Sequence, residues 1–66
     1  MELTITRGEQ PHLINSVQMA DGEVEPTEAE IARRVDALAP MKPTGKVWLW
    51  KDCLGKWQMW IELEDD

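Results

Sequence analysis

Cysteine and histidine are almost absent from this chain of 66 residues, which has one of each, Cys53 and His12. A single cysteine excludes an internal disulfide, and these two side chains do not make a set of metal ligands. General acid–base and nucleophilic catalysis need several titratable groups positioned in one cleft. The chain has no serine near a plausible base and no glycine-rich phosphate loop. We therefore expect no enzyme activity, no metal and no other cofactor.

Long hydrophobic runs and basic residues are also scarce. No apolar stretch approaches the length of a membrane-spanning helix, and residues 1–10 lack the apolar segment of a signal peptide. Thirteen acidic residues against seven basic ones give a net charge of −6. A field of this sign repels nucleic acid and anionic membranes and attracts basic partners. With the single free cysteine, this composition predicts a soluble cytoplasmic protein that touches neither nucleic acid nor membrane directly.

Tyrosine and phenylalanine are missing, and all four tryptophans lie between Lys46 and Asp66. A domain this small needs a disulfide, a metal, a partner or an unusually rich core. Each tryptophan can bury about 150–250 Å² of surface. We therefore expect the tryptophans to supply much of the core of a single domain that covers residues 1–66.

Three segments carry secondary-structure patterns. Residues 1–7 alternate between apolar and polar side chains, which predicts a half-buried strand. Residues 27–39 show helical spacing, and Thr27 with Glu30 forms a capping box at the start. Residues 12–25 are ambiguous: their apolar spacing suits a helix, and Asp21-Gly22 suits a tight hairpin. For this segment we favour irregular or short-strand structure.

The segment KVWLWKDCLGKWQMWIELEDD predicts a hairpin with strands over 46–51 and 56–64. With a connection of two or four residues, Trp48 and Trp50 share the core face with Trp57, Met59, Ile61 and Leu63. Val47, Leu49 and Trp60 then lie on the opposite face. A connection of odd length with a bulge swaps this pairing. The expected fold is a small α+β domain, an antiparallel sheet of three or four strands with one helix packed on it.

The acidic residues gather in two segments, around 21–30 and at 62–66. Such runs often only keep a protein soluble. Alternatively, they imitate a nucleic-acid backbone and bind the basic groove of a nucleic-acid-handling protein, with an exposed Trp60 as an apolar anchor. The candidate partner-binding residues are Asp21, Glu23, Glu25, Glu28, Glu30, Trp60, Glu62, Glu64, Asp65 and Asp66.

In size, charge and pattern of elements, the whole chain resembles the small acidic inhibitors encoded by phages and mobile elements, chiefly anti-CRISPR proteins. The resemblance implies a compact α+β domain without enzymatic activity that blocks a CRISPR effector complex, in some members by imitating DNA. It involves no specific motif and assigns no residue roles. We therefore expect a non-catalytic inhibitor that occludes a DNA-binding site in a bacterial cytoplasm.

Two other functions stay open. The first is a structural or oligomerising module, a monomer or weak homodimer whose interface is the outer hairpin face with Val47, Leu49 and Trp60. The second is single-stranded nucleic-acid binding by stacking of bases on the tryptophans. The excess of acids opposes this second function, because phosphate neutralisation dominates such affinity.

Overall fold

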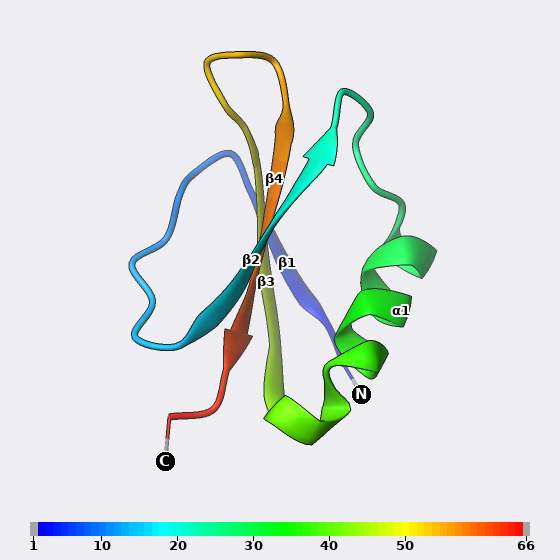
Figure 1. The fold of residues 1–66 in the computed structure, drawn as a ribbon, viewed down its shortest axis with the longest axis vertical. Coiled ribbons are helices and arrows are strands. Elements are labelled where there is room, and N and C mark those ends of the chain that lie inside the picture. The colour runs from blue at the N-terminus through cyan, green and yellow to red at the C-terminus, as the bar shows by residue number, and fades with distance from the viewer. Residues whose placement is uncertain (1, 66) are drawn as a thin grey trace.

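The structure, a computed structural model, describes residues 2–65 apart from the side chain of Asp21. In chain order, the elements of this part are β1 (Thr4–Arg7), β2 (Ser16–Gly22), the helix α1 (Glu28–Ala37), a 3-10 helix (Ala39–Met41), β3 (Pro43–Lys51) and β4 (Trp57–Leu63). The strands form one sheet in the order β1-β3-β4-β2, and α1 lies against one of its faces (Figure 1). The expected α+β class, with one α-helix and a C-terminal hairpin, is confirmed.

The sheet is mixed, because β1 runs parallel to β3 while β3–β4 and β2–β4 are antiparallel. The sequence suggested an entirely antiparallel sheet. The difference arises because β1 and β2 lie at opposite edges. Residues 8–15 must therefore cross the sheet, and no tight turn imposes antiparallel pairing on β1. The alternation predicted for residues 1–7 holds where it is described, since Leu3 and Ile5 both pack against the core.

Helix α1 follows the pattern predicted for residues 27–39. The hydroxyl of Thr27 accepts a hydrogen bond of 3.2 Å from the backbone N–H of Glu30, which caps the first turn. Ile31 and Val35, one turn apart, are both fully buried against the sheet. The helix ends at Ala37, and its C-cap Leu38 directly precedes the short 3-10 helix.

Residues 12–25 contain the strand β2, so the interpretation as short-strand structure is confirmed. The two alternatives for this segment, a helix and a hairpin at Asp21-Gly22, are wrong. The chain leaves the sheet at Gly22, which has a φ of 87°, and the next apolar residue, Val24, is 78% exposed. The partner of β2 is the distant strand β4, with Val17 opposite Ile61.

The face assignment of the C-terminal hairpin was wrong for β3 only, because Met59, Ile61 and Leu63 of β4 lie on the expected core face. Val47 pairs with Ile61 and Leu49 with Met59, and all four side chains are fully buried. Trp48 and Trp50 lie on the opposite face, where Trp48 pairs with Trp60 and Trp50 with Gln58. The helix-facing side therefore carries Val47, Leu49, Trp57, Met59, Ile61 and Leu63. Trp57 is on the expected face, where it packs half-buried against the core.

The cause of this register is the odd length of the connection. The backbone N–H of Asp52 donates to the carbonyl of Lys56 at 2.8 Å, so only Cys53, Leu54 and Gly55 lie outside the ladder. The N–H of Gly55 donates to the carbonyl of Asp52 at 3.0 Å, and Gly55 has a φ of 78°. A turn followed by a left-handed residue is the usual geometry of a three-residue hairpin. This connection of three residues is the alternative of odd length given in the sequence analysis.

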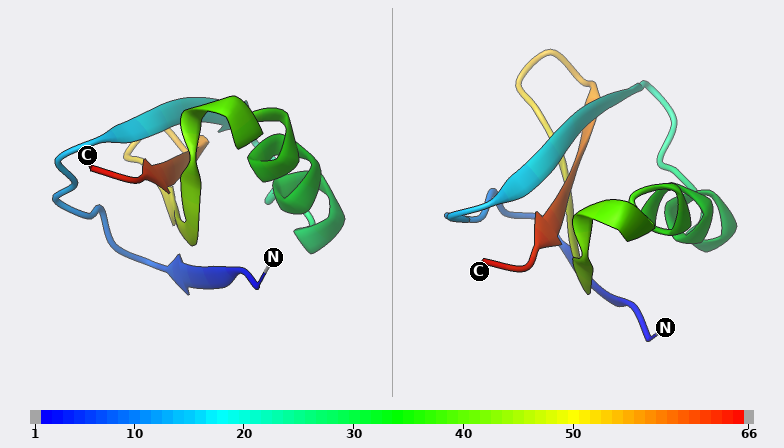
Figure 2. Two further views of the ribbon diagram at one scale, coloured as in Figure 1. Left: turned by 90° about the horizontal axis from the view of Figure 1, so that it is seen from below. Right: turned by 60° about the horizontal axis from the view of Figure 1, so that its bottom comes forward.

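The sheet is covered on both faces. Helix α1 covers the face that contains the buried core, and residues 8–15 cross on the opposite side (Figure 2). Pro11 and Leu13 of this connection are half-buried, as are Trp48, Trp50 and Trp60. The tryptophan-rich face is therefore a second, smaller packing layer.

Candidate functional site

The acidic loop, which we define as residues 23–25, lies between β2 and α1. Glu25 forms an ion pair with Arg7 at 3.0 Å between Oε1 and Nε, and Glu23 lies 3.9 Å from Nζ of Lys56. Exposed pairs of this kind contribute only about 0–1 kcal/mol to folding. However, they partly neutralise the two carboxylates that a basic partner would contact. The side chain of Asp21, another candidate, lies outside the described part of the chain.

Glu28 and Glu30 occupy the first turn of α1. Negative charge at this position stabilises a helix by about 0.3–1 kcal/mol, because it faces the positive end of the helix dipole. This arrangement provides a structural role for both residues, whether or not a partner binds them.

The C-terminal acidic group, which we define as Glu62, Glu64 and Asp65, differs from the acidic loop. None of its three carboxylates forms an ion pair with a residue that the structure describes. The hydroxyl of Thr44 donates a hydrogen bond of 2.9 Å to Oε1 of Glu62. Asp66, the last candidate of this segment, lies outside the described residues.

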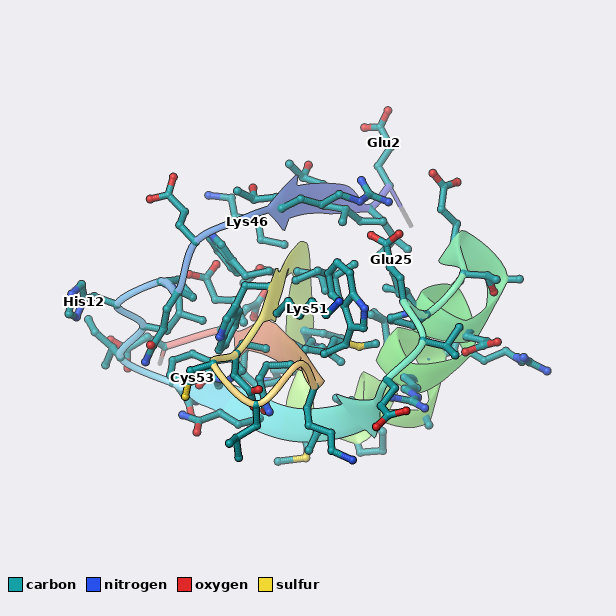
Figure 3. The ribbon with its side chains drawn as sticks, turned by 90° about the horizontal axis from the view of Figure 1, so that it is seen from above. Glu2, His12, Glu25, Lys46, Lys51 and Cys53 are labelled. Carbon is teal, nitrogen blue, oxygen red and sulfur yellow. The ribbon has the colours of Figure 1, made fainter. Side chains whose placement is uncertain are left out.

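The two acidic segments lie apart. Gly22, which precedes the acidic loop, pairs with Trp57 at the start of β4, and the C-terminal acidic group lies around the end of that strand. At about 3.3 Å per residue, β4 separates them by about 20 Å. Figure 3 shows Glu25 on the side of α1 and His12, in the connection 8–15, on the far side. The structure therefore does not join the predicted residues into one surface.

Trp60 lies on the outer face beside Glu62, as the sequence suggested, but its ring is half-buried. Its ring centroid lies 4.9 Å from that of Trp50, and the two planes meet at 74°. Edge-to-face pairs of this kind add about 0.5–1.5 kcal/mol beyond the surface that they bury. Trp60 is therefore first a packing residue of the second layer, and only part of its ring is accessible to a partner or a base.

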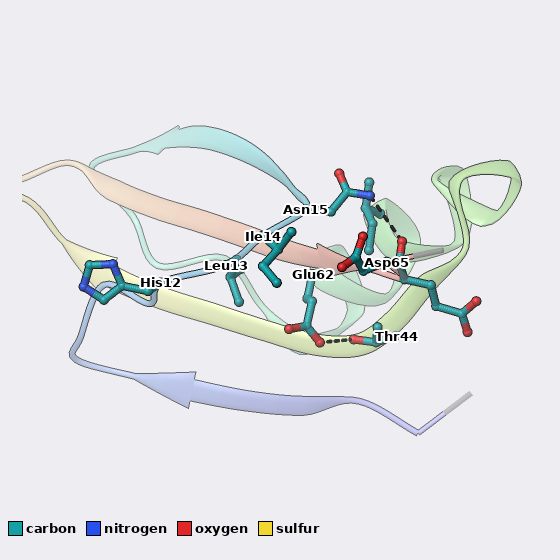
Figure 4. Close-up of a pocket in the computed structure, with 9 residues that line it drawn as sticks. His12, Leu13, Ile14, Asn15, Thr44, Glu62 and Asp65 are labelled. Atoms are coloured by element: carbon teal, nitrogen blue, oxygen red, sulfur yellow. Dashed lines mark hydrogen bonds between the residues drawn. The ribbon is translucent and has the colours of Figure 1, made fainter.

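A hollow of about 420 Å³ lies between the connection 8–15 and the end of the hairpin (Figure 4). It is lined by residues 12–15 of the connection, by residues 62–65 and by Thr44 of β3. The sequence drew attention to Glu62, Glu64 and Asp65 but not to residues 12–15. The signal that was missed is tertiary, because the crossing of residues 8–15 follows from the sheet order.

Two features bear on chemistry. Cys53 is exposed in the hairpin connection, and among residues 2–65 no group of three metal-ligating side chains comes together. The backbone N–H of Lys56, the side chain of Gln58 and the backbone N–H of Leu54 donate hydrogen bonds to Asp52, and these bonds lower the pKa of its carboxyl group. Asp52 closes the hairpin and is therefore structural.

None of the helices in residues 2–65 combines the length and the apolar character that crossing a membrane requires. The chain matches no protein-family model, and no curated protein and no solved structure is significantly similar to it.

Proposed function

We propose that this protein is a non-catalytic inhibitor that binds a basic, nucleic-acid-handling protein complex, such as a CRISPR effector, and blocks its DNA-binding site. The partner is a protein complex of the bacterial cytoplasm, and the inhibitor contacts neither nucleic acid nor membrane directly.

The observation that carries this proposal is the C-terminal acidic group, whose carboxylates have no ion-pair partner among the described residues. It belongs to a chain with a net charge of −6. Glu62 lies in β4 and Glu64 directly follows its last residue; alternate positions of an extended chain lie about 6.6 Å apart. This spacing is close to twice the rise of about 3.4 Å between phosphates of one DNA strand. A basic groove that follows such phosphates can therefore bind these carboxylates.

The acidic loop contributes less in this proposal, because Glu23 and Glu25 already have cations beside them. A partner must displace Arg7 and Lys56 before it binds these two carboxylates fully. Reversal of charge at Glu64 and Asp65 should therefore weaken binding more than reversal at Glu23 and Glu25. Both double substitutions change the net charge by the same amount, so each is the control for the other.

The experiment is an affinity capture from bacterial lysates that contain active CRISPR effectors and nucleases. The bait carries its tag at the N-terminus, and the washes rise in salt concentration. We expect a nucleic-acid-handling complex to elute between low and moderate salt, because contacts between exposed charges are screened. Duplex DNA added as a competitor should release it as well. Retention that is insensitive to both salt and DNA would refute occlusion of a DNA site.

A second candidate is an oligomerising module, although its expected interface was wrong in part. Val47 and Leu49 are fully buried beneath α1 and cannot form an outer face. The observation that favours self-association is instead the edge strand β2, in which residues 16–20 carry no charge. Unguarded edges pair readily with another strand. Sedimentation at low and high salt tests this candidate, because a dimer through β2 should persist at high salt.

A further inference from the structure

The hollow beneath residues 12–15 combines two kinds of wall. Leu13 and Ile14 provide the apolar wall, and Ile14 is 88% exposed. Glu62 and Asp65 provide the acidic wall, and Figure 4 shows their carboxylates on the side where Leu13 and Ile14 lie. A volume of about 420 Å³ falls within the range of about 300–1,000 Å³ that is common for ligand pockets.

The Glu62 carboxylate of the acidic wall is held in place before any ligand arrives. Thr44 orients the carboxylate of Glu62 through its hydrogen bond of 2.9 Å. The side-chain amide of Asn15 donates to the carbonyl of Glu64 at 3.2 Å, and the backbone N–H of Leu63 donates to the carbonyl of Asn15 at 3.0 Å. These bonds tie the connection 8–15 to the end of β4. Contacts within the protein therefore fix the apolar wall and the Glu62 carboxylate relative to each other.

The combination of carboxylates and an apolar wall indicates which kind of ligand fits the hollow. Carboxylates alone attract any cation, but an apolar wall beside them favours a cation with an apolar stem. No lysine or arginine is among the described residues that line the hollow. A guanidinium group offers several N–H donors in one plane, which suits two neighbouring carboxylates better than the single ammonium group of lysine. The occupant that fits is an arginine side chain.

We propose that this hollow binds an arginine side chain of the partner, with the guanidinium group on Glu62 and Asp65 and the methylene stem against Leu13 and Ile14. The proposal rests on the proposed function, since it identifies which group of the basic partner is recognised and where. The arginine anchors the inhibitor at this end of the sheet, while the remaining acids contribute long-range attraction.

The test uses Nα-acetyl-arginine amide as the probe, titrated into the isotope-labelled full chain and followed by two-dimensional NMR. We expect saturable shifts of the backbone amides of Ile14, Thr44 and Glu62. The citrulline analogue, which has nearly the same shape without the charge, should bind at least tenfold more weakly, because hydrogen bonds to charged groups are the stronger ones.

Glu62→Gln is the informative variant, because a glutamine still accepts the hydrogen bond of Thr44 and so preserves the fold. It should weaken binding of the arginine probe by about three- to tenfold, as expected for an exposed charge-assisted contact. The matched control is Asp36→Asn, which removes the same charge from an exposed position of α1 and should leave the affinity unchanged.

Equal effects of the two variants, or equal binding of arginine and citrulline, would overturn the proposal. Its failure can be distinguished from failure of the proposed function. If the arginine probe does not bind, but the capture still yields a complex that salt and DNA release, only the arginine site is refuted. Specific probe binding without any such complex refutes only the inhibitor function.

Discussion

Leu49→Ala is the substitution that best tests the register of the C-terminal hairpin. Leu49 is fully buried at the centre of β3, opposite Met59 and in one cluster with Ile31 of α1. Truncation of a buried leucine costs about 2–5 kcal/mol, the upper part of this range where the surroundings cannot collapse into the cavity. A domain of this length has a total stability of about 3–10 kcal/mol at about 0.05–0.15 kcal/mol per residue. The variant should therefore lose a large share of its stability.

The matched control is Leu54→Ala, which makes the same chemical change in the same hairpin at a residue that is 80% exposed. It should cost no more than about 0.5 kcal/mol. Urea unfolding followed by circular dichroism measures both. With a slope of about 1 kcal/mol/M, Leu49→Ala should lower the midpoint by about 2 M or more. If the two variants unfolded at the same urea concentration, Leu49 would not be a core residue, and the register would be shifted by one.

Two further predictions concern single hydrogen-bond acceptors. Thr27→Ala removes the N-cap of α1 and should cost about 1 kcal/mol of stability, which lowers the melting temperature by about 4–8 °C in a domain of this size. Thr27→Ser keeps a hydroxyl at this position and should retain the original melting temperature. An unchanged melting temperature in the alanine variant would contradict the cap. Asp52→Ala should lower the urea midpoint at neutral pH, and the difference from the unchanged protein should narrow as the pH falls. The sign follows from the lowered pKa of Asp52, because its stabilisation is present above the ordinary value of 3.8 and is lost as the pH falls through the lower folded value. Midpoints measured from neutral pH to about pH 3 test this, and a constant difference would refute it.

The elements that the sequence predicted are those that local chemistry specifies. Thr27 and Glu30 predict the start of α1, and the hydrogen bond from the backbone N–H of Glu30 to the Thr27 hydroxyl is present. The alternation of residues 1–7 places Leu3 and Ile5 on the core side. In both cases the residues that carry the signal lie within a few positions of one another. No information about distant parts of the chain is needed to interpret them.

The parts that could not be predicted depend on contacts between distant segments. β2 has β4 as its partner, and β1 lies beside β3, although neither pair is adjacent in the sequence. The hollow exists because residues 12–15 cross above the end of the hairpin. The sequence identified Glu62 and Asp65 by charge alone, without the apolar wall that makes them a candidate site. It also gave no sign that the two acidic segments lie at opposite ends of β4.

The two faces of the C-terminal hairpin show why alternation failed there. Strand β3 carries Val47 and Leu49 on one face and Trp48 and Trp50 on the other, so both faces are apolar and hydrophobicity cannot choose between them. Both are apolar because both are covered, one by α1 and the other by residues 8–15. The parity is decided instead in the connection, where the left-handed Gly55 and the hydrogen bonds to Asp52 close a loop of odd length. In a sheet covered on both sides, the turn therefore determines which residues form the main core.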